Sequence, residues 1–379
     1  MNKVKFGIIG AGNAWHFHSV ADKGSEYISY TAVYNHNFEK AKQAVAEYKD
    51  GVMKPCAGLD ELLGADIDAV LVMAPHVNHE EIVTRCAKAG KHILCEKPMA
   101  TTVEACRRMI KICHDAKIKF MIAENHRFLP AHIYMHDVVQ QGLIGDVLMI
   151  RGYEGVNELE SLSDPNSWKG DPLKAGGGSF MDMAAHKFAV IEYILGFRCT
   201  KVIANLAKQA FNVPGKTEDN AVAIAYFEND AIADIMVSFS QITLPYNTLE
   251  IFGTRGSILE NHDWVKPVRF CSFDERMGDK QQKWLEPDIR HGPFPEYYNI
   301  SLREEDEHFA RCILESREPE FSPEEAMHSV TDILAGYLSA EQGRPVETVE
   351  IEKLADAERS IDVLKGLIAA VPLNKRLVK

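Results

Sequence analysis

Two ionisable side chains, Asp182 and His186, have the types and spacing for acid–base chemistry on a hydroxyl group. They lie four residues apart in a segment that predicts a helix, so they share one helix face. A carboxylate beside an imidazole fixes its tautomer, which makes the histidine able to take a hydroxyl proton as hydride leaves the same carbon. Spacing alone favours plainer roles: Ser179 and Asp182 also fit a capping box, and a buried histidine is commonly hydrogen-bonded in a core.

Lys97 is a third candidate, because it stands where a strand should end. It belongs to Cys95-Glu96-Lys97-Pro98, which closes a short apolar run, and Pro98 excludes helical geometry at the residue before it. Ligands of open parallel sheets bind beyond the carboxyl ends of the strands. Lys97 could there bind a substrate hydroxyl or help transfer its proton. A solvated lysine paired with Glu96 fits the spacing equally well.

A glycine-rich turn follows the first apolar run and opens a helical pattern. In Gly10-Ala11-Gly12-Asn13-Ala14-Trp15, the first glycine would make the tight turn and the second would let the backbone approach a pyrophosphate. The helix N-terminus would supply N–H donors and a positive dipole end. Trp15 replaces the usual third glycine, so the helix must pack on the strand in another way. The alternative is an ordinary strand-to-helix turn.

The choice of dinucleotide depends on the end of the second strand. An acidic residue about 20 positions after the glycine turn would bind the ribose 2′-hydroxyl. Asn35 stands there; it can bond a hydroxyl, it does not repel a 2′-phosphate, and no arginine follows to attract one. We therefore predict NAD as the cofactor, with NADP as the alternative.

The first third of the chain alternates between apolar runs and helical patterns. Short, β-branched runs separated by amphipathic segments predict a parallel sheet covered on both faces, a doubly wound α/β domain. The predicted strands are 4–9, 30–34, 67–74, 92–95 and 120–123, and the predicted helices are 37–48, 79–89 and 102–116.

After about residue 125, strand-like segments follow one another without intervening helices. This pattern predicts a mostly antiparallel sheet with helices on one face. The predicted strands are 144–156, 200–211, 219–228, 231–241 and 247–260, and the predicted helices are 130–141, 179–195, 300–315, 323–342 and 352–371. We expect the polar stretch 274–299 to be a long surface loop.

Composition narrows the class of protein. The 379 residues carry a formal net charge of −13, from 42 Lys and Arg against 55 Asp and Glu, which argues against nucleic-acid and anionic-membrane partners. No apolar run approaches the roughly 20 residues that cross a bilayer. The eight cysteines form no C-x-x-C pair, so we expect reduced thiols in a cytoplasmic protein, and we expect no metal site.

Six stretches together resemble the glucose–fructose oxidoreductase / inositol dehydrogenase / MocA (Gfo/Idh/MocA) family of NAD(P)-dependent oxidoreductases. They are VKFGIIGAGNAWHFH, VLVMAPHVNHEEI, AGKHILCEKPMATT, ENHRFLPA, WKGDPLKAGGGSFMDMAAH and YLSAEQGRPVE. His18 matches the family's histidine downstream of the turn, and His76 replaces the usual asparagine after Pro75. The resemblance covers about residues 3 to 347.

The resemblance implies a two-domain α/β protein acting on a sugar, glycoside or inositol. It implies a Rossmann dinucleotide-binding domain over 1–125 and a C-terminal α/β domain with an open, mainly antiparallel sheet over 126–350. A helical extension, 351–379, matches no family motif. The resemblance further implies a homodimer or homotetramer built on the sheets, and it makes Lys97–Pro98 a candidate cis peptide.

The resemblance also assigns site residues. The catalytic set is Lys97, Asp182 and His186, with His186 as the base, Asp182 orienting it, and Lys97 holding or protonating the reacting oxygen. The cofactor-binding set is Gly10, Gly12, Asn13, Trp15, Asn35, Ala74, Pro75, His76, His79, Glu96, Lys97 and Asn125. The substrate-binding set is Lys97, Asn125, Arg127, Tyr153, Trp168, Asp182 and His186.

Two other functions use the same residues. One is a glycoside hydrolase or lyase that uses tightly bound NAD transiently, so that the hydride returns and no net reduction is seen. The other is a non-catalytic NAD- or sugar-binding regulator. The joint presence of Lys97, Asp182 and His186 argues against the regulator, because a binding module needs no acid–base set.

Overall fold

The computed structural model describes residues 3–209 and 216–370, and the chain divides into two compact units. The first comprises Met1–Ala100, Ala105–Asn125 and Tyr298–Met327, and the second comprises Thr101–Glu104, His126–Tyr297 and His328–Lys379. The segment Tyr298–Met327 therefore groups with the first unit, although it falls inside the predicted range 126–350.

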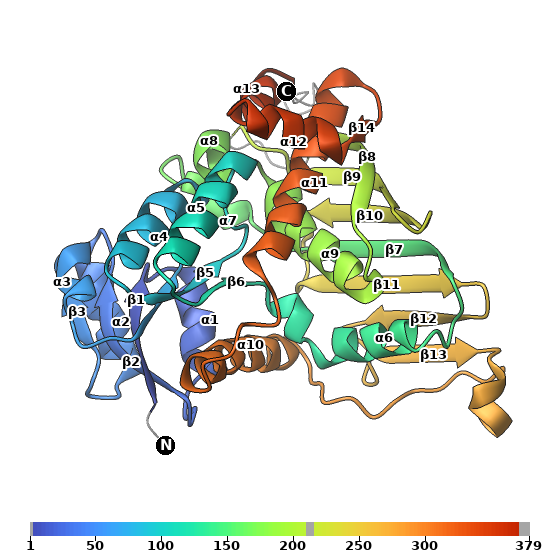
Figure 1. Ribbon diagram of the computed structural model, residues 1–379, viewed down its shortest axis with the longest axis horizontal. Coiled ribbons are helices and arrows are strands. Elements are labelled where there is room, and N and C mark those ends of the chain that lie inside the picture. Colours follow the sequence, from blue (N-terminus) through green and yellow to red (C-terminus); the bar gives the residue numbers. More distant parts are fainter. Residues whose placement is uncertain (1–2, 210–215, 371–379) are drawn as a thin grey trace. The chain divides into compact units, whose positions relative to one another are not determined.

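The first unit is built on a six-stranded parallel sheet in the order β3-β2-β1-β4-β5-β6 (Figure 1). The strands are β1 (Val4–Ile9), β2 (Ile28–Tyr34), β3 (Lys54–Cys56), β4 (Ala69–Val72), β5 (His92–Glu96) and β6 (Phe120–Ala123). The helices are α1 (Asn13–Ala21), α2 (Phe38–Tyr48), α3 (Leu59–Leu63), α4 (His79–Lys88), α5 (Val103–Asp115) and α10 (Glu296–Leu314). This strand order is that of the doubly wound dinucleotide-binding fold, as the sequence predicts.

Strands β4 and β6 are apolar throughout, as expected for a sheet that helices cover on both faces. Every residue of β4 and β6 is buried, which matches the near-continuous apolar runs of the sequence. Polar side chains that could do chemistry are thereby confined to the strand ends and the turns that follow them.

The second unit contains an eight-stranded sheet in the order β13-β12-β11-β7-β10-β9-β8-β14. Its strands are β7 (Val147–Gly155), β8 (Cys199–Ala207), β9 (Asn220–Phe227), β10 (Ile232–Ser238), β11 (Tyr246–Gly253), β12 (Gly256–Asn261), β13 (Val268–Ser272) and β14 (Val346–Glu347). Among the described strands, only β7 and β10 pair in parallel, so the sheet is mainly antiparallel, as predicted.

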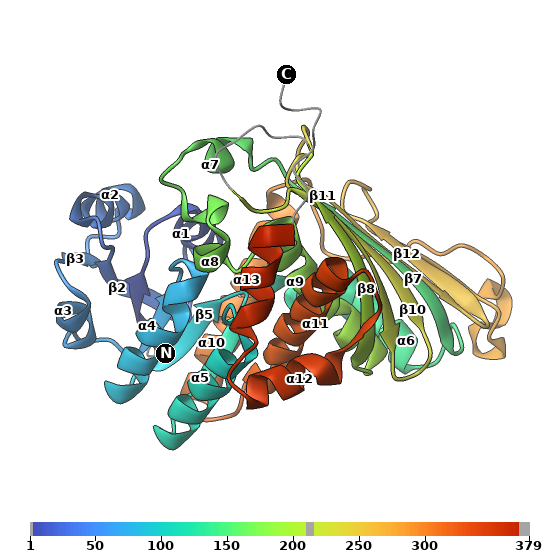
Figure 2. The same cartoon turned by 90° about the horizontal axis from the view of Figure 1, so that it is seen from above.

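Helices gather on one face of this sheet. The buried helix α9 (Ser179–Leu195) packs on β7 and β10, and Figure 2 shows α9 and α11 (Pro323–Gln342) on the same side. The other helices of four or more residues are α6 (Pro130–Gln140), α7 (Leu159–Ser163), α8 (Pro172–Ala175), α12 (Thr348–Asp356) and α13 (Ile361–Ala370). In the described part of the chain, no helix is both long and apolar enough to span a membrane.

Four sequence predictions of elements need correction. The predicted strand 247–260 is a hairpin of β11 and β12, and the predicted helix 352–371 is two helices, α12 and α13. The predicted loop 274–299 contains a 3₁₀ helix, Glu275–Lys280, and the start of α10. The short strands β3 and β13 were missed. Positions 210–211 of the strand predicted over 200–211, position 371, and the rest of the tail to 379 lie outside the described residues.

Candidate active site

The glycine turn presents open backbone donors at the start of α1. Gly10 has a φ of +101°, and a Cβ there would lie 2.3 Å from the carbonyl oxygen of Met73, so the close approach of β1 and β4 requires glycine. Gly12 is the N-cap of α1 and forms no side-chain cap, and a Cβ on it would meet no atom within 4 Å. The turn at Gly12 is therefore open at the N-terminus of α1, which fits a dinucleotide pyrophosphate.

Asn35 braces this turn from the end of β2. Its Oδ1 accepts the N–H of Ala11 at 3.1 Å, and its Nδ2 donates to the carbonyl oxygen of Asn37 at 3.1 Å. Asn37 in turn caps α2 by accepting the N–H of Glu39. One Nδ2 hydrogen and one Oδ1 lone pair of Asn35 are left over from these bonds.

Trp15 solves the packing problem left by the missing third glycine. Its side chain is only 4% exposed, and its ring meets that of Tyr30 on β2 edge-to-face at 5.0 Å. The ring of Tyr48 on α2 lies 5.6 Å away. A large aromatic side chain thus fills the space between helix and sheet, and any contact of Trp15 with a cofactor would come from its backbone.

The loop after β4 is tied to the segment after β5 by His79. Its Nε2 lies 2.9 Å from the carbonyl oxygen of Ala74, and its Nδ1 lies 3.1 Å from that of Pro98. Burial lowers the pKa of His79, partly offset by these carbonyls. His79 therefore acts as an internal brace between the two predicted cofactor-binding loops. Pro75 is half-buried and His76 is buried in the same loop.

Lys97 follows directly on β5 and is half-buried. The Lys97–Pro98 peptide is cis, as the resemblance implied. The backbone N–H of Lys97 donates to Glu96 Oε2 at 3.1 Å. Asn125, at the end of β6, donates from Nδ2 to Ser301 Oγ at 2.8 Å on α10.

A buried chain of charges holds the strand end that carries Lys97. His18 on α1 is fully buried; its Nε2 lies 3.1 Å from Glu96 Oε1 and its Nδ1 lies 2.5 Å from Asp306 Oδ2 on α10. Burial would lower the pKa of His18, but Asp306 and Glu96 together raise it well above its usual value. The imidazole is therefore charged and joins α1, β5 and α10.

The pKa values of two neighbouring carboxyl groups are also raised. Burial, and then the charge of Asp306, raise the pKa of both Asp22 and Glu305 well above the usual range. Burial and the charge of Asp306 thus both disfavour the ionised forms of these two groups.

In the second unit, the N-terminus of α9 is capped by Glu218, which precedes β9. Its Oε1 accepts the N–H groups of Gly178 and Phe180, each at 2.9 Å, and the hydroxyl of Tyr337. The N-cap residue is Gly178, so the capping box considered for Ser179 and Asp182 is absent. That explanation for Asp182 was wrong.

Asp182 instead faces a lysine. Its Oδ2 lies 3.3 Å from Lys169 Nζ, which also lies 2.8 Å from Glu158 Oε1. Burial would lower the pKa of Lys169, but Asp182 and Glu158 raise it above its usual value. Lys169 and Glu158 were not singled out from the sequence, since only folding brings α7 and the following loop beside α9.

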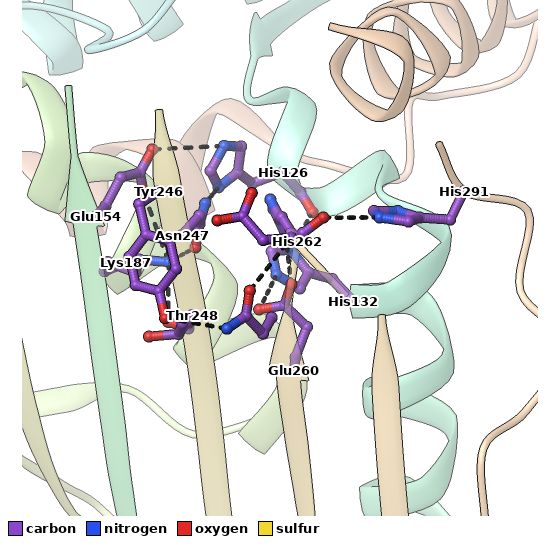
Figure 3. A network of polar contacts seen from close by, with 12 residues as sticks. His126, His132, Glu154, Lys187, Tyr246, Asn247, Thr248, Glu260, His262 and His291 are labelled. Atoms are coloured by element: carbon purple, nitrogen blue, oxygen red, sulfur yellow. Dashed lines mark hydrogen bonds and ion pairs between the residues drawn. The ribbon is translucent and has the colours of Figure 1, made fainter. Parts of the chain in front are cut away.

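The ring of His186 stacks on that of His126, with centroids 4.1 Å apart and planes 14° apart. Burial, and then the nearby charges of His186 and Lys187, lower the pKa of His126 well below its usual value. Lys187 is fully buried and lies 3.6 Å from Glu154, whose other oxygen lies 3.6 Å from His126 (Figure 3). The one signal of this network in the sequence is a lysine inside an otherwise apolar helix.

The weaker substrate candidates are dispersed over the second unit. The Arg127 guanidinium lies 4.3 Å from the ring centroid of Tyr193, and the Tyr153 hydroxyl donates to Gln241 Oε1 at 2.7 Å. Trp168 begins a 3₁₀ helix and is half-buried. The structure thus groups the predicted residues by unit: the cofactor set and Lys97 in the first, Asp182 and His186 in the second.

A parallel sheet with an open glycine turn, followed by a mainly antiparallel sheet, defines a dinucleotide-dependent oxidoreductase of two units. Two family models match the chain: "Oxidoreductase family, NAD-binding Rossmann fold" over residues 4–124, and "GFO/IDH/MocA C-terminal domain" over residues 132–259. The chain belongs to the Gfo/Idh/MocA family and is an NAD(P)-dependent oxidoreductase, which confirms the predicted family, fold class and cofactor.

Individual relatives support this family assignment. Myo-inositol 2-dehydrogenase of Thermotoga maritima is 27% identical over 92% of this chain and 99% of its own length. An uncharacterised oxidoreductase of Rhizobium meliloti is 30% identical over 74% of this chain and 81% of its own length. A solved levoglucosan dehydrogenase, in complex with NADH and levoglucosan, superposes with a TM-score of 0.81 over 91% of this chain and 99% of that one, at 24% identity.

Asn35→Asp should strengthen the preference for NAD over NADP. The carboxylate can still accept the N–H of Ala11, and its charge repels a 2′-phosphate by about 1 kcal/mol at contact distance in water. We expect the ratio of kcat/KM for NAD to that for NADP to rise about fivefold. Gln43→Glu, which adds the same charge on the exposed face of α2, is the control. An unchanged ratio in the Asn35 variant would show that Asn35 does not lie beside the adenosine ribose.

His18→Ala should lower the free energy of unfolding by about 3–5 kcal/mol, because it leaves Asp306 buried without its ion-pair partner. The folded-state pKa of His18 is raised, so its contribution is complete below the unfolded pKa of about 6.5 and declines as pH rises through the folded value. Urea unfolding at several pH values measures this. His16→Ala, exposed on the same helix, should change stability by less than about 0.5 kcal/mol. Equal effects of the two variants would contradict the account.

Proposed function

We propose that this oxidoreductase interconverts a secondary hydroxyl of a sugar, glycoside or cyclitol and the corresponding ketone. The observation that carries the proposal is the open glycine turn at the start of α1, where a Cβ on Gly12 would meet no atom within 4 Å. The name of the Thermotoga maritima relative supports a cyclitol or sugar as the substrate class. The net charge of −13 favours a neutral polyol over an anionic one.

The coenzyme would supply one chemical step, the acceptance of a hydride from the carbinol carbon. Gly10, Gly12 and Asn13 would approach its pyrophosphate, and Asn35 its adenosine ribose. Ala74, Pro75, His76, His79 and Glu96 would line the nicotinamide side, with His79 and Glu96 acting through the loops and the strand end that they brace.

Proton transfer would fall to side chains of the chain itself. His186 would take the hydroxyl proton as the carbonyl forms, because a neutral imidazole is a base near neutral pH. Lys97 would hold the reacting oxygen and stabilise its developing negative charge. Asp182, which pairs with Lys169, would help to orient His186 from one turn earlier on α9.

Lys97→Ala and His186→Ala should each lower kcat by at least about 100-fold, the usual contribution of an acid–base group, with little change in NAD affinity. Reduced-nicotinamide absorbance with a polyol substrate measures turnover, and fluorescence titration measures coenzyme binding. His114→Ala, 88% exposed in its side chain on α5, is the control and should keep full activity. Near-normal turnover in either test variant would refute its catalytic role.

We also propose a cytoplasmic homodimer or homotetramer that uses the outer face of the eight-stranded sheet. Alternate residues of β7, β9 and β10 place apolar side chains on the face opposite α9. Met149, Val222 and Met236 are 55%, 44% and 42% exposed there, and Met236 lies directly across from Val222 in the sheet. Exposed apolar side chains on one face of a sheet favour association with a second copy.

The double variant Met149→Lys/Met236→Lys should convert the oligomer to a monomer, since it places two charges per copy in the proposed interface. Sedimentation velocity gives the masses directly. Val265→Lys, at a position 95% exposed outside this sheet face, should leave the oligomer intact. A monomeric parent chain, or an oligomer that survives in the double variant, would contradict the proposal.

A further inference from the structure

A second cluster of ionisable groups lies inside the second unit, separate from Asp182 and Lys169. His132 projects from α6 and Glu260 from β12 (Figure 3). His262 directly follows Asn261, the last residue of β12. The three side chains are 2% exposed or less, and each offers one ligand atom within 4.8 Å of the other two.

The ring of His132 is held so that one nitrogen is free, and His262 is held through its backbone and the face of its ring. The Nδ1 of His132 donates to the carbonyl oxygen of His126 at 2.7 Å, so the neutral ring carries its lone pair on Nε2. The backbone of His262 is held by His291, whose Nε2 lies 2.9 Å from its carbonyl oxygen, and its ring packs on Tyr297 at 4.5 Å.

These atoms face one another without forming hydrogen bonds. His132 Nε2 lies 3.8 Å from Glu260 Oε2, which is too long for a hydrogen bond. His262 Nε2 lies 2.6 Å from Glu260 Oε1, but the pair does not have hydrogen-bond geometry. Both carboxylate oxygens, both His262 ring nitrogens and His132 Nε2 have no hydrogen-bond partner in the described part of the chain.

Buried polar atoms without hydrogen-bond partners are costly, and a carboxylate facing imidazole lone pairs is stabilised by a positive charge between them. The nearby cation Lys187 does not supply it, because its Nζ is engaged by the side-chain oxygen of Asn247 and lies 3.4 Å from the carbonyl oxygen of Thr248. Two imidazoles and one carboxylate are, by contrast, the ligand set that transition metals such as Zn²⁺ take at about 2.0–2.2 Å.

We propose that His132, Glu260 and His262 bind one divalent transition-metal ion, with the fourth position taken by water or a substrate oxygen. The imidazole ligands select such an ion over Mg²⁺ or Ca²⁺, which prefer oxygen. The ion ties α6 to β12 beneath His126, whose ring stacks on His186. The bound ion would thus help to position His126 beside the proposed base, His186. The metal proposal does not depend on the proposal that His186 is the base.

No motif in the sequence predicts this site. His132 is 128 positions before Glu260, and no spacing typical of a zinc motif relates them. Only pairing of β11 with β12, and packing of α6 nearby, brings these three side chains together, so the sequence gives no reason to expect a metal site.

The test is metal content and Co²⁺ spectroscopy on the full chain. Protein stripped with a chelator and titrated with Zn²⁺ should bind one equivalent, and Co²⁺ should give visible d–d absorption typical of a four-coordinate nitrogen and oxygen site. Glu260→Gln and His132→Gln should weaken Zn²⁺ binding at least about 100-fold, since each removes a direct ligand. His136→Gln, one turn along α6, should bind as the parent does.

Circular dichroism checks that each variant is folded. If both ligand variants unfold, X-ray absorption of the Co²⁺-loaded parent protein decides. Two imidazole ligands on the ion would support the proposal, and the absence of imidazole ligands would overturn it. Substoichiometric Zn²⁺ with no Co²⁺ absorption in the parent protein overturns it, as does unchanged Zn²⁺ affinity in folded Glu260→Gln. Because none of these readings measures turnover, their failure is distinct from failure of the proposed dehydrogenase activity.

Discussion

The buried ion pair between His18 and Asp306 is the interaction on which the first unit's chemistry depends. His18 stands on the helix opened by the glycine turn, and its other nitrogen meets Glu96, the residue before Lys97. One imidazolium therefore fixes the distance between the dinucleotide turn and the proposed catalytic lysine. Asp306 and Glu96 outweigh the effect of burial and raise the pKa of His18, whereas burial and then Asp306 raise the pKa values of Asp22 and Glu305.

In the second unit, a helix cap rather than a buried ion pair positions the element that carries the candidate catalytic residues. Glu218 caps the central helix α9 from outside, and Gly178 permits its approach, since a Cβ on Gly178 would lie 2.0 Å from the Glu218 carbonyl oxygen. The cap leaves Asp182 to pair with Lys169. Two turns of a buried helix thus carry Asp182, His186 and Lys187, each matched by a polar group from another element. Such matching is required where water cannot satisfy buried charge.

Most of the fold could be predicted because the strands of the first sheet are largely apolar, the strand-like segments of the second follow one another without helices, and many turns carry glycine or proline. The hairpin of β11 and β12 was missed because its turn, Thr254-Arg255, interrupts the strand pattern only briefly. The break between α12 and α13 carries no proline or glycine; Ser360 there bonds Glu104 and the N–H of Val103, which is a tertiary effect. The candidate residues at strand ends were foreseeable from motifs. Lys169, Glu218, His126 and the metal ligands were not, since their partners are remote in sequence.

The most direct test of the account follows the hydrogen itself. The protein would be incubated with NAD and a neutral polyol, such as myo-inositol, deuterated at its carbinol carbons, and the reduced coenzyme analysed by mass spectrometry. The account predicts one deuterium transferred to the nicotinamide for each ketone formed. Consumption of a deuterated polyol or glycoside without deuterium in free reduced coenzyme would contradict it and would indicate that the hydride returns to the substrate carbon.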